Sequence, residues 1–201
     1  MNKYYDFTEN KEEDETVIDA KDVVDKTCSI FTEVCEKVNL GDILKEPDID
    51  FESLFKNDIL NFMSYMAASD GLISTSDAEY ISEVLDIDIN TNKLNKRILD
   101  KNIYSEEFEN EIPPTIAIIV ALDNAIDSDE APLSAISEGY IYLLILLARQ
   151  MIERNGRTPF DEATDVEKDN LQIYCNMIFS FLNKKMNRYN KDIVFDCNNK
   201  K

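Results

Sequence analysis

Apolar residues recur along most of the chain at intervals of three and four, which is the spacing of one face of an α-helix. The pattern is clearest over residues 17–38, where one continuous stripe contains Val24, Cys28, Phe31, Cys35 and Val38. Gly41 follows at a position suited to a left-handed helix cap. No strand-like alternation of apolar and polar residues extends over more than four residues. The pattern therefore predicts an all-α protein.

Further helices are expected between turn and capping signals. A helix over residues 50–68 ends before Asp70-Gly71, and its predicted buried face contains Phe51, Phe55, Ile59, Phe62, Met63 and Met66. Later helices are predicted over residues 74–85, 93–101, 114–126, 134–154 and 164–188. Ser74 with Asp77, and Thr164 with Glu167, have the spacing of capping boxes. The whole pattern predicts a bundle of about seven to nine helices.

The composition agrees with a helical fold and suggests how the chain is divided. Only four Gly and five Pro occur in 201 residues, fewer than an all-β protein of this length usually needs for its turns. We expect a flexible acidic leader over residues 1–16, an N-terminal helix and linker over 17–50, the main helical domain over 51–188 and a basic tail over 189–201. The longest apolar run, Ile141–Ala148, is too short to cross a bilayer, so no membrane insertion is expected.

The charge of the chain restricts its partners. Lys and Arg number 21 and Asp and Glu number 41, so the net charge is −20. Such a chain repels nucleic acid and anionic membrane surfaces, and it attracts cations and basic protein surfaces. An acidic surface that serves only solubility would have the same composition. No secretory signal precedes the first helix, so a cytoplasmic location is expected.

Residue types that support much of enzyme chemistry are missing. Histidine is absent, which excludes Ser-His-Asp and Cys-His catalysis and histidine-based zinc or iron sites. The four cysteines form no CxxC pair and are expected to be reduced thiols: Cys28, Cys35, Cys175 and Cys197. The sequence therefore favours a binding or scaffolding protein over an enzyme.

A short internal repeat supplies the candidate site. One long helix ends at Asp70-Gly71, with Asp77 seven residues after Asp70, and another ends at Asn155-Gly156, with Glu162 seven residues after Asn155. Oxygen-bearing side chains at the two sides of such a turn can converge, and Ca²⁺ and Mg²⁺ prefer oxygen ligands. Helix ends, a helix cap and a solvated acid would also explain these four residues without any metal. The repeat predicts two similar helix–turn–helix halves.

The first of these turns is not an EF-hand, because Met66 and Ala68 would occupy its first liganding positions. The segment FMSYMAASDGLISTSDAEYISEVL resembles instead the Asp-Gly turn of the tellurite-resistance TerB-like family. That resemblance implies an all-helical domain of two similar halves, with acidic residues from both halves binding a divalent cation. It covers residues 51–182 and assigns Asp70, Asp77 and Glu162 as ligands. Asn155 stands where the family has Asp, which lowers the charge of the second half-site.

Two functions follow from these observations and stay open. The first is a non-enzymatic TerB-like module that binds Ca²⁺ or Mg²⁺ and engages a protein partner in a stress or envelope-associated response. The second is an acidic interaction module, similar to an immunity protein or an antitoxin, that binds a basic partner without metal. A carboxylate-metal hydrolase would need more clustered ligands than the sequence shows.

Overall fold

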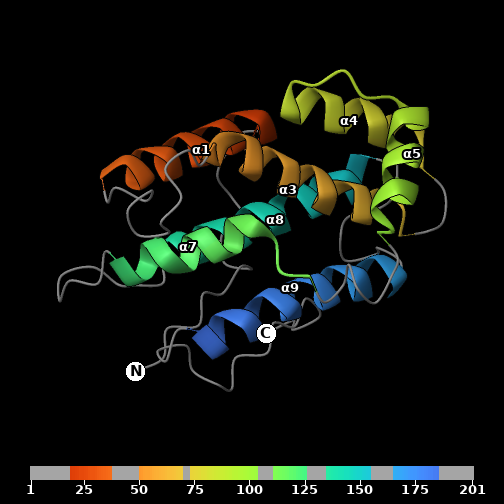
Figure 1. Ribbon diagram of the computed structural model, residues 1–201. Coiled ribbons are helices and arrows are strands. Elements are labelled where there is room, and N and C mark those ends of the chain that lie inside the picture. The colour runs from red at the N-terminus through yellow and green to blue at the C-terminus, as the bar shows by residue number, and fades with distance from the viewer. Residues whose placement is uncertain are drawn as a thin grey trace, which may run out of the picture.

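The computed structural model describes residues 19–37, 50–69, 73–103, 111–125, 135–154 and 165–185. Within these ranges the chain forms seven helices and no strand, which confirms the all-α class (Figure 1). The helices are α1 (Ala20–Lys37), α3 (Phe51–Ala67), α4 (Thr75–Leu85), α5 (Thr91–Lys101), α7 (Pro114–Ala125), α8 (Ala135–Arg154) and α9 (Asp165–Lys185). The predicted leader, the linker after α1 and the tail from residue 189 lie outside the described residues.

Helices α3 and α8 form the centre of the bundle. α3 packs against every other described helix, and α8 packs against α1, α3, α4, α7 and α9. α1 and α4 lie on one side of this central pair and α9 on the opposite side (Figure 1). The arrangement explains why α3 and α8 are apolar around much of their circumference, since each must bury more than one face.

The apolar faces predicted from the sequence form the core. All six predicted positions of α3 are buried, and so are Val24, Cys28, Phe31 and Cys35 of α1. The ring of Phe31 contacts Phe51 and Phe55 edge-on, and Phe55 in turn contacts Tyr140 of α8. These aromatic contacts join α1, α3 and α8 into one core. Within the apolar run of α8, Tyr142 is exposed.

Local side-chain caps start three of the helices, and the sequence predicted the one at α4. Asp50 accepts a hydrogen bond from the backbone amide of Ser53 at the start of α3, and Asn90 accepts one from Lys93 at the start of α5. The capping box of Ser74 and Asp77 is present at the start of α4. Each cap satisfies amide groups that the helix itself leaves unpaired.

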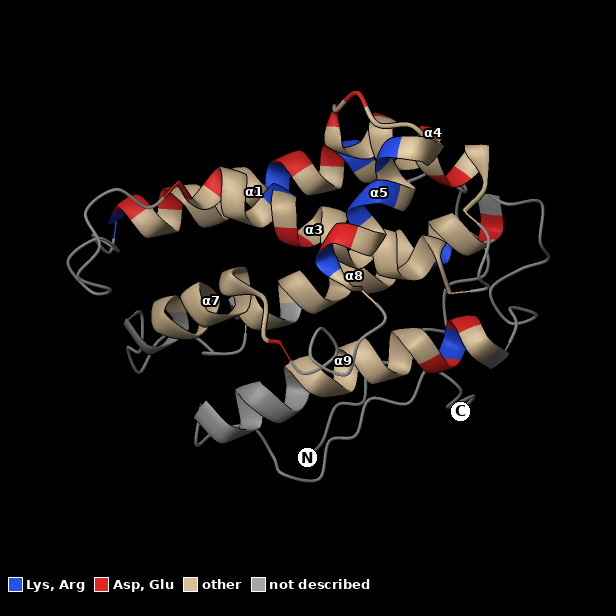
Figure 2. Ribbon diagram, turned by 45° about the vertical axis from the view of Figure 1, so that its right-hand side comes forward, with Lys and Arg blue, Asp and Glu red and all other residues tan. Residues whose placement is uncertain are grey.

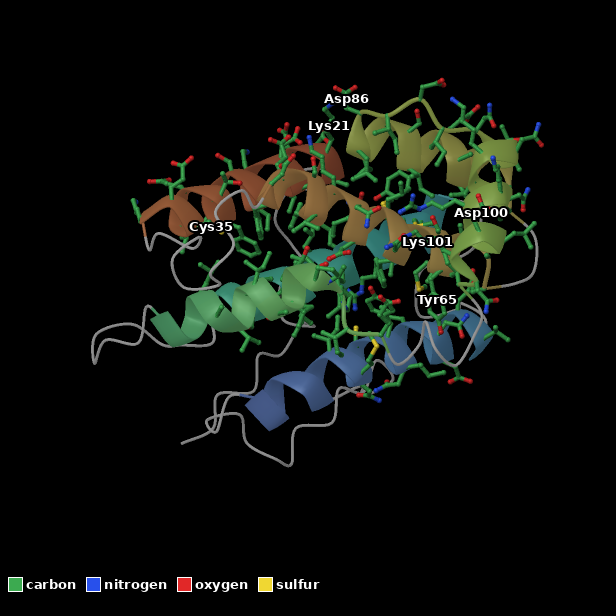
Figure 3. The ribbon with its side chains drawn as sticks, in the orientation of Figure 1. Lys21, Cys35, Tyr65, Asp86, Asp100 and Lys101 are labelled. Carbon is green, nitrogen blue, oxygen red and sulfur yellow. The ribbon has the colours of Figure 1, made fainter. Side chains whose placement is uncertain are left out.

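Charged side chains lie mainly on the outer helices. In Figure 2 they line α1, α4 and α5, while α7, with the sequence PTIAIIVALDNA, is almost free of them. Lys21 of α1 and Asp86 at the end of α4 form an ion pair of 3.3 Å and lie side by side in Figure 3. Among the described helices, none is both long and apolar enough to span a membrane.

Candidate functional site

A small pocket lies where the ends of four helices meet. It is lined by Met66, Ala67 and Ser69 at the end of α3, Asp77 in the first turn of α4, Met151 and Ile152 near the end of α8, and Glu167 in the first turn of α9. The space inside it has room for little more than one water-sized molecule, so the pocket suits an ion or a single water molecule better than an organic substrate.

Asp77 is held in this pocket by the capping box of its own helix. Its Oδ2 atom accepts hydrogen bonds from the Ser74 amide at 2.9 Å and from the Ser74 hydroxyl at 2.8 Å. The Asp77 amide donates in return to the Ser74 hydroxyl oxygen at 3.0 Å. The side chain is only 4% exposed, so the cap also fixes a carboxylate against the interior of the bundle.

Glu167 brings a second buried carboxylate to the same pocket. It is also 4% exposed and lies in the first turn of α9, where the positive end of the helix dipole favours an acid. Asp77 and Glu167 are 90 positions apart in the chain and come from different helical hairpins, α3–α4 and α8–α9. The pocket therefore combines hard oxygen donors with the thioether side chains of Met66 and Met151.

Of the four residues predicted as ligands, the structure describes only Asp77. Asp70, Asn155 and Glu162 lie outside the described residues, so their convergence with Asp77 stays a prediction. Asp70 directly follows Ser69, which lines the pocket, and Asn155 directly follows the last residue of α8. Within the described ranges, no group of three or more His, Cys, Asp or Glu side chains comes together in a metal-binding arrangement.

Glu167 is not among the predicted ligands, because the prediction placed the second acid seven residues after Asn155, at Glu162. The α3–α4 and α8–α9 hairpins share a spacing of five residues from Met66 to Gly71 and from Met151 to Gly156, and both methionines line the pocket. The segment from Gly156 to α9 is longer than the one from Gly71 to α4, so the first-turn acid of α9 comes later after its glycine. Alignment on the two capping boxes, rather than on the distance from the glycine, would have paired Asp77 with Glu167.

A second buried carboxylate site lies at the start of α7, and the sequence did not indicate it. Asp58 of α3 is 1% exposed, and its Oδ2 atom accepts a hydrogen bond of 2.8 Å from the Thr115 amide. α7 has no capping side chain of its own, because Pro113 and Pro114 occupy its start. Asp58 therefore acts as a cap supplied by another helix, and it fixes α7 to α3.

The environment of Asp58 is polar but sealed from solvent. Burial raises the pKa of Asp58, the hydrogen bond from the Thr115 amide and the nearby Thr115 hydroxyl lower it, and the nearby Glu111 raises it. The Arg97 guanidinium of α5 donates to the Asn57 and Asn61 amide oxygens of α3 at 2.7 and 2.6 Å. Burial lowers the pKa of Arg97, and the charge of Asp58 raises it, so Asp58 favours the ionised form of the guanidinium.

The buried thiols are poorly suited to nucleophilic chemistry. Cys28, Cys35 and Cys175 are free and buried, as predicted, while Cys197 lies outside the described residues. Burial raises the pKa of Cys28, and it raises the pKa of Cys35 to about 11. Because the thiolate is the reactive species, these two side chains are inert near neutral pH.

In comparisons with protein-family models, with curated proteins and with solved structures, none matches this chain. The evidence on function therefore consists of the residues and the geometry described above.

Proposed function

We propose that this chain is a non-enzymatic, TerB-like module that binds a divalent cation where the α3–α4 and α8–α9 hairpins meet, and that it acts through a protein partner. The observation that carries the proposal is the pocket with Asp77 and Glu167 in its wall. Carboxylate oxygens that line one pocket are the ligands that hard divalent cations prefer.

The donor set fits a hard cation. Ca²⁺ takes six to eight oxygen ligands and Mg²⁺ six, with water completing the shell in many sites. Asp77, Glu167 and the Ser69 hydroxyl would supply oxygens from the pocket, and Asp70, Asn155 and Glu162 belong to the chain segments that join its helices. The methionine sulfur atoms suit soft metals and contribute packing here.

The correspondence between the two hairpins supports a TerB-like arrangement of two similar halves. Met66 and Met151 both lie five residues before the glycine of an Asx-Gly pair, and each hairpin places its first-turn acid in the shared pocket. A cation held there would bridge the hairpins, and its loss would change how they pack. Such a dependence is the physical basis on which an ion could control a partner-binding surface.

The test is thermal unfolding of chelated protein titrated separately with Ca²⁺ and Mg²⁺. A cation that binds only the native state raises stability by about 2.7 kcal/mol at a hundredfold excess over its dissociation constant. We expect this increment for the wild-type protein and its loss in Asp77→Asn and in Glu167→Gln. The increment is compared within each variant, because both substitutions also weaken a helix start.

Glu79→Gln provides the matched control, because Glu79 is an exposed acid of α4 outside the pocket. It should keep the full cation-dependent increment. Equal stabilisation of all variants by both cations would indicate charge screening and would refute the proposed site.

A second function is favoured by the surface of α4 and the turn after it. The exposed acids there are Glu79, Glu83, Asp86 and Asp88, and α4 itself contains no Lys or Arg. An acidic surface of this kind would suit a basic protein partner, bound without metal in the manner of an immunity or antitoxin protein. Salt-sensitive binding of such a partner that is weakened by Glu79→Lys, but unaffected by Asp77→Asn and by chelation, would favour this second function.

A further inference from the structure

Two hydroxyl groups near Asp58 are sealed inside the bundle without a hydrogen-bond partner. Thr115 of α7 and Tyr140 of α8 are both fully buried, and neither the Thr115 Oγ1 atom nor the Tyr140 Oη atom forms a hydrogen bond. Buried polar atoms almost always have a partner in a folded protein, either another protein group or an ordered water molecule. We therefore expect each of these hydroxyl groups to have a hydrogen-bond partner.

Both hydroxyls are neighbours of the same carboxylate. The Thr115 amide donates to Oδ2 of Asp58 at 2.8 Å, and the Thr115 hydroxyl is close enough to lower the pKa of that carboxyl, although it makes no hydrogen bond of normal geometry. The Tyr140 ring contacts the ring of Phe55, which lies one turn before Asp58 on α3, with the ring centroids 5.9 Å apart. Burial raises the pKa of the Tyr140 phenol, and the charges of Tyr174 and Asp58 raise it further. Asp58 thus lies between α7 and α8 with one unpaired hydroxyl nearby on each.

The surroundings of this cluster limit the ligand that it can take. An ion is costly to bury in a closed interior unless an opposite charge and hydrogen bonds compensate for the lost water, so the site favours a neutral molecule. The molecule must accept hydrogen bonds from hydroxyl groups and donate one to a carboxylate, and it must be small enough for a closed interior. Water has these properties, and buried water molecules typically make about three hydrogen bonds.

We propose that one ordered water molecule is bound among Asp58, Thr115 and Tyr140 and links α7 and α8 to α3. In this arrangement the water accepts from the Tyr140 hydroxyl and exchanges hydrogen bonds with the Thr115 hydroxyl and the Asp58 carboxylate. It extends the cap that Asp58 provides to α7 into a three-helix connection. The site is separate from the pocket of Asp77 and Glu167 and does not depend on cation binding there.

A high-resolution crystal structure of the full chain tests the site directly. We expect a water peak about 2.7–3.0 Å from Tyr140 Oη and from an oxygen of Asp58 or Thr115. In parallel, Tyr140→Phe should lower Tm by about 2–4 °C, because it removes a hydrogen bond that the water satisfies. The water should be absent from the crystal structure of that variant.

Tyr80→Phe is the matched control, since the buried Tyr80 donates directly to Gln150 Oε1 at 2.9 Å. It should lower Tm by a similar amount and leave the water in place. The proposal would be overturned by a direct hydrogen bond from Tyr140 to Asp58 with no water peak. It would also be overturned by a rise in Tm for Tyr140→Phe, since a rise would mean that the hydroxyl is unsatisfied.

Discussion

Asp77 and Asp58 are both buried carboxylates at the start of a helix, but they reach that position in different ways. Asp77 caps its own helix and bonds to Ser74, three residues before it. Asp58 caps a helix 57 residues away, where the start of α7 has prolines in place of a capping side chain. The first arrangement belongs to a local turn, and the second holds two distant parts of the chain together.

The difference determines what each carboxylate is available to do. Asp77 caps its own helix within one turn and also lines, with Glu167, the pocket where the proposed cation would bind. Asp58 lies deep between helices and is surrounded by groups that need its charge or its oxygen atoms, among them Thr115 and Arg97. We therefore expect Asp58 to contribute mainly to stability and Asp77 mainly to binding.

The largest effect is expected for Asp58→Ala. The substitution leaves the buried Thr115 amide without an acceptor and the Arg97 guanidinium without its nearby counter-charge, at a cost of about 2–3 kcal/mol in the free energy of unfolding. Urea denaturation measures the loss. Amide hydrogen exchange should show faster exchange in the first turn of α7 than elsewhere in the core.

Asp58→Asn separates the contribution of the acceptor oxygen to stability from the contribution of the negative charge. It keeps an acceptor for the Thr115 amide, so the loss should be smaller than for Asp58→Ala. If Asp58→Ala stayed within about 0.5 kcal/mol of the wild-type protein, as an ordinary surface substitution does, the long-range cap would be unimportant and the comparison with Asp77 would fail.

A smaller effect is expected for Ser74→Ala, which removes the hydroxyl that accepts from the Asp77 amide. Loss of such a cap costs about 1 kcal/mol, measured by the same urea denaturation. Thr75→Ala is the control, because Thr75 is the exposed neighbour of Ser74. A loss for Ser74→Ala as large as that for Asp58→Ala would show that the two carboxylate sites do not differ as proposed.

The smallest effect is expected from pH. Burial raises the pKa of Asp58 above its ordinary value of 3.8, so the native protein keeps this proton to a higher pH than the unfolded chain does. The contribution of Asp58 to stability is then fully present below pH 3.8 and declines as pH rises through the folded pKa. The difference in unfolding free energy between wild type and Asp58→Asn should follow that decline in a urea denaturation series. A difference that grew with pH would mean that the hydrogen bond from Thr115 outweighs burial.

The helices were largely predictable, and the sites were predictable only in part. The apolar spacing located α1 and α3 together with their buried faces, and Ser74 with Asp77 marked the start of α4. The apolar spacing of α3 predicted its buried apolar residues, but it did not indicate that Asp58 is buried as well. The fixed offset selected Glu162, which lies outside the described residues, and it did not select Glu167, which lines the pocket with Asp77.

The features that could be predicted depend on residues within a few positions of one another: the all-α class, the start of α4 and the buried faces of α1 and α3. Hydrogen bonds within one turn and the 3.6-residue period produce these features, and both can be read along the chain. The folded arrangement was needed to show that Asp77 and Glu167 line one pocket and that Asp58 caps α7. Those pairings depend on how the helices pack around α3 and α8, and contacts between distant residues leave no periodic signal in the sequence.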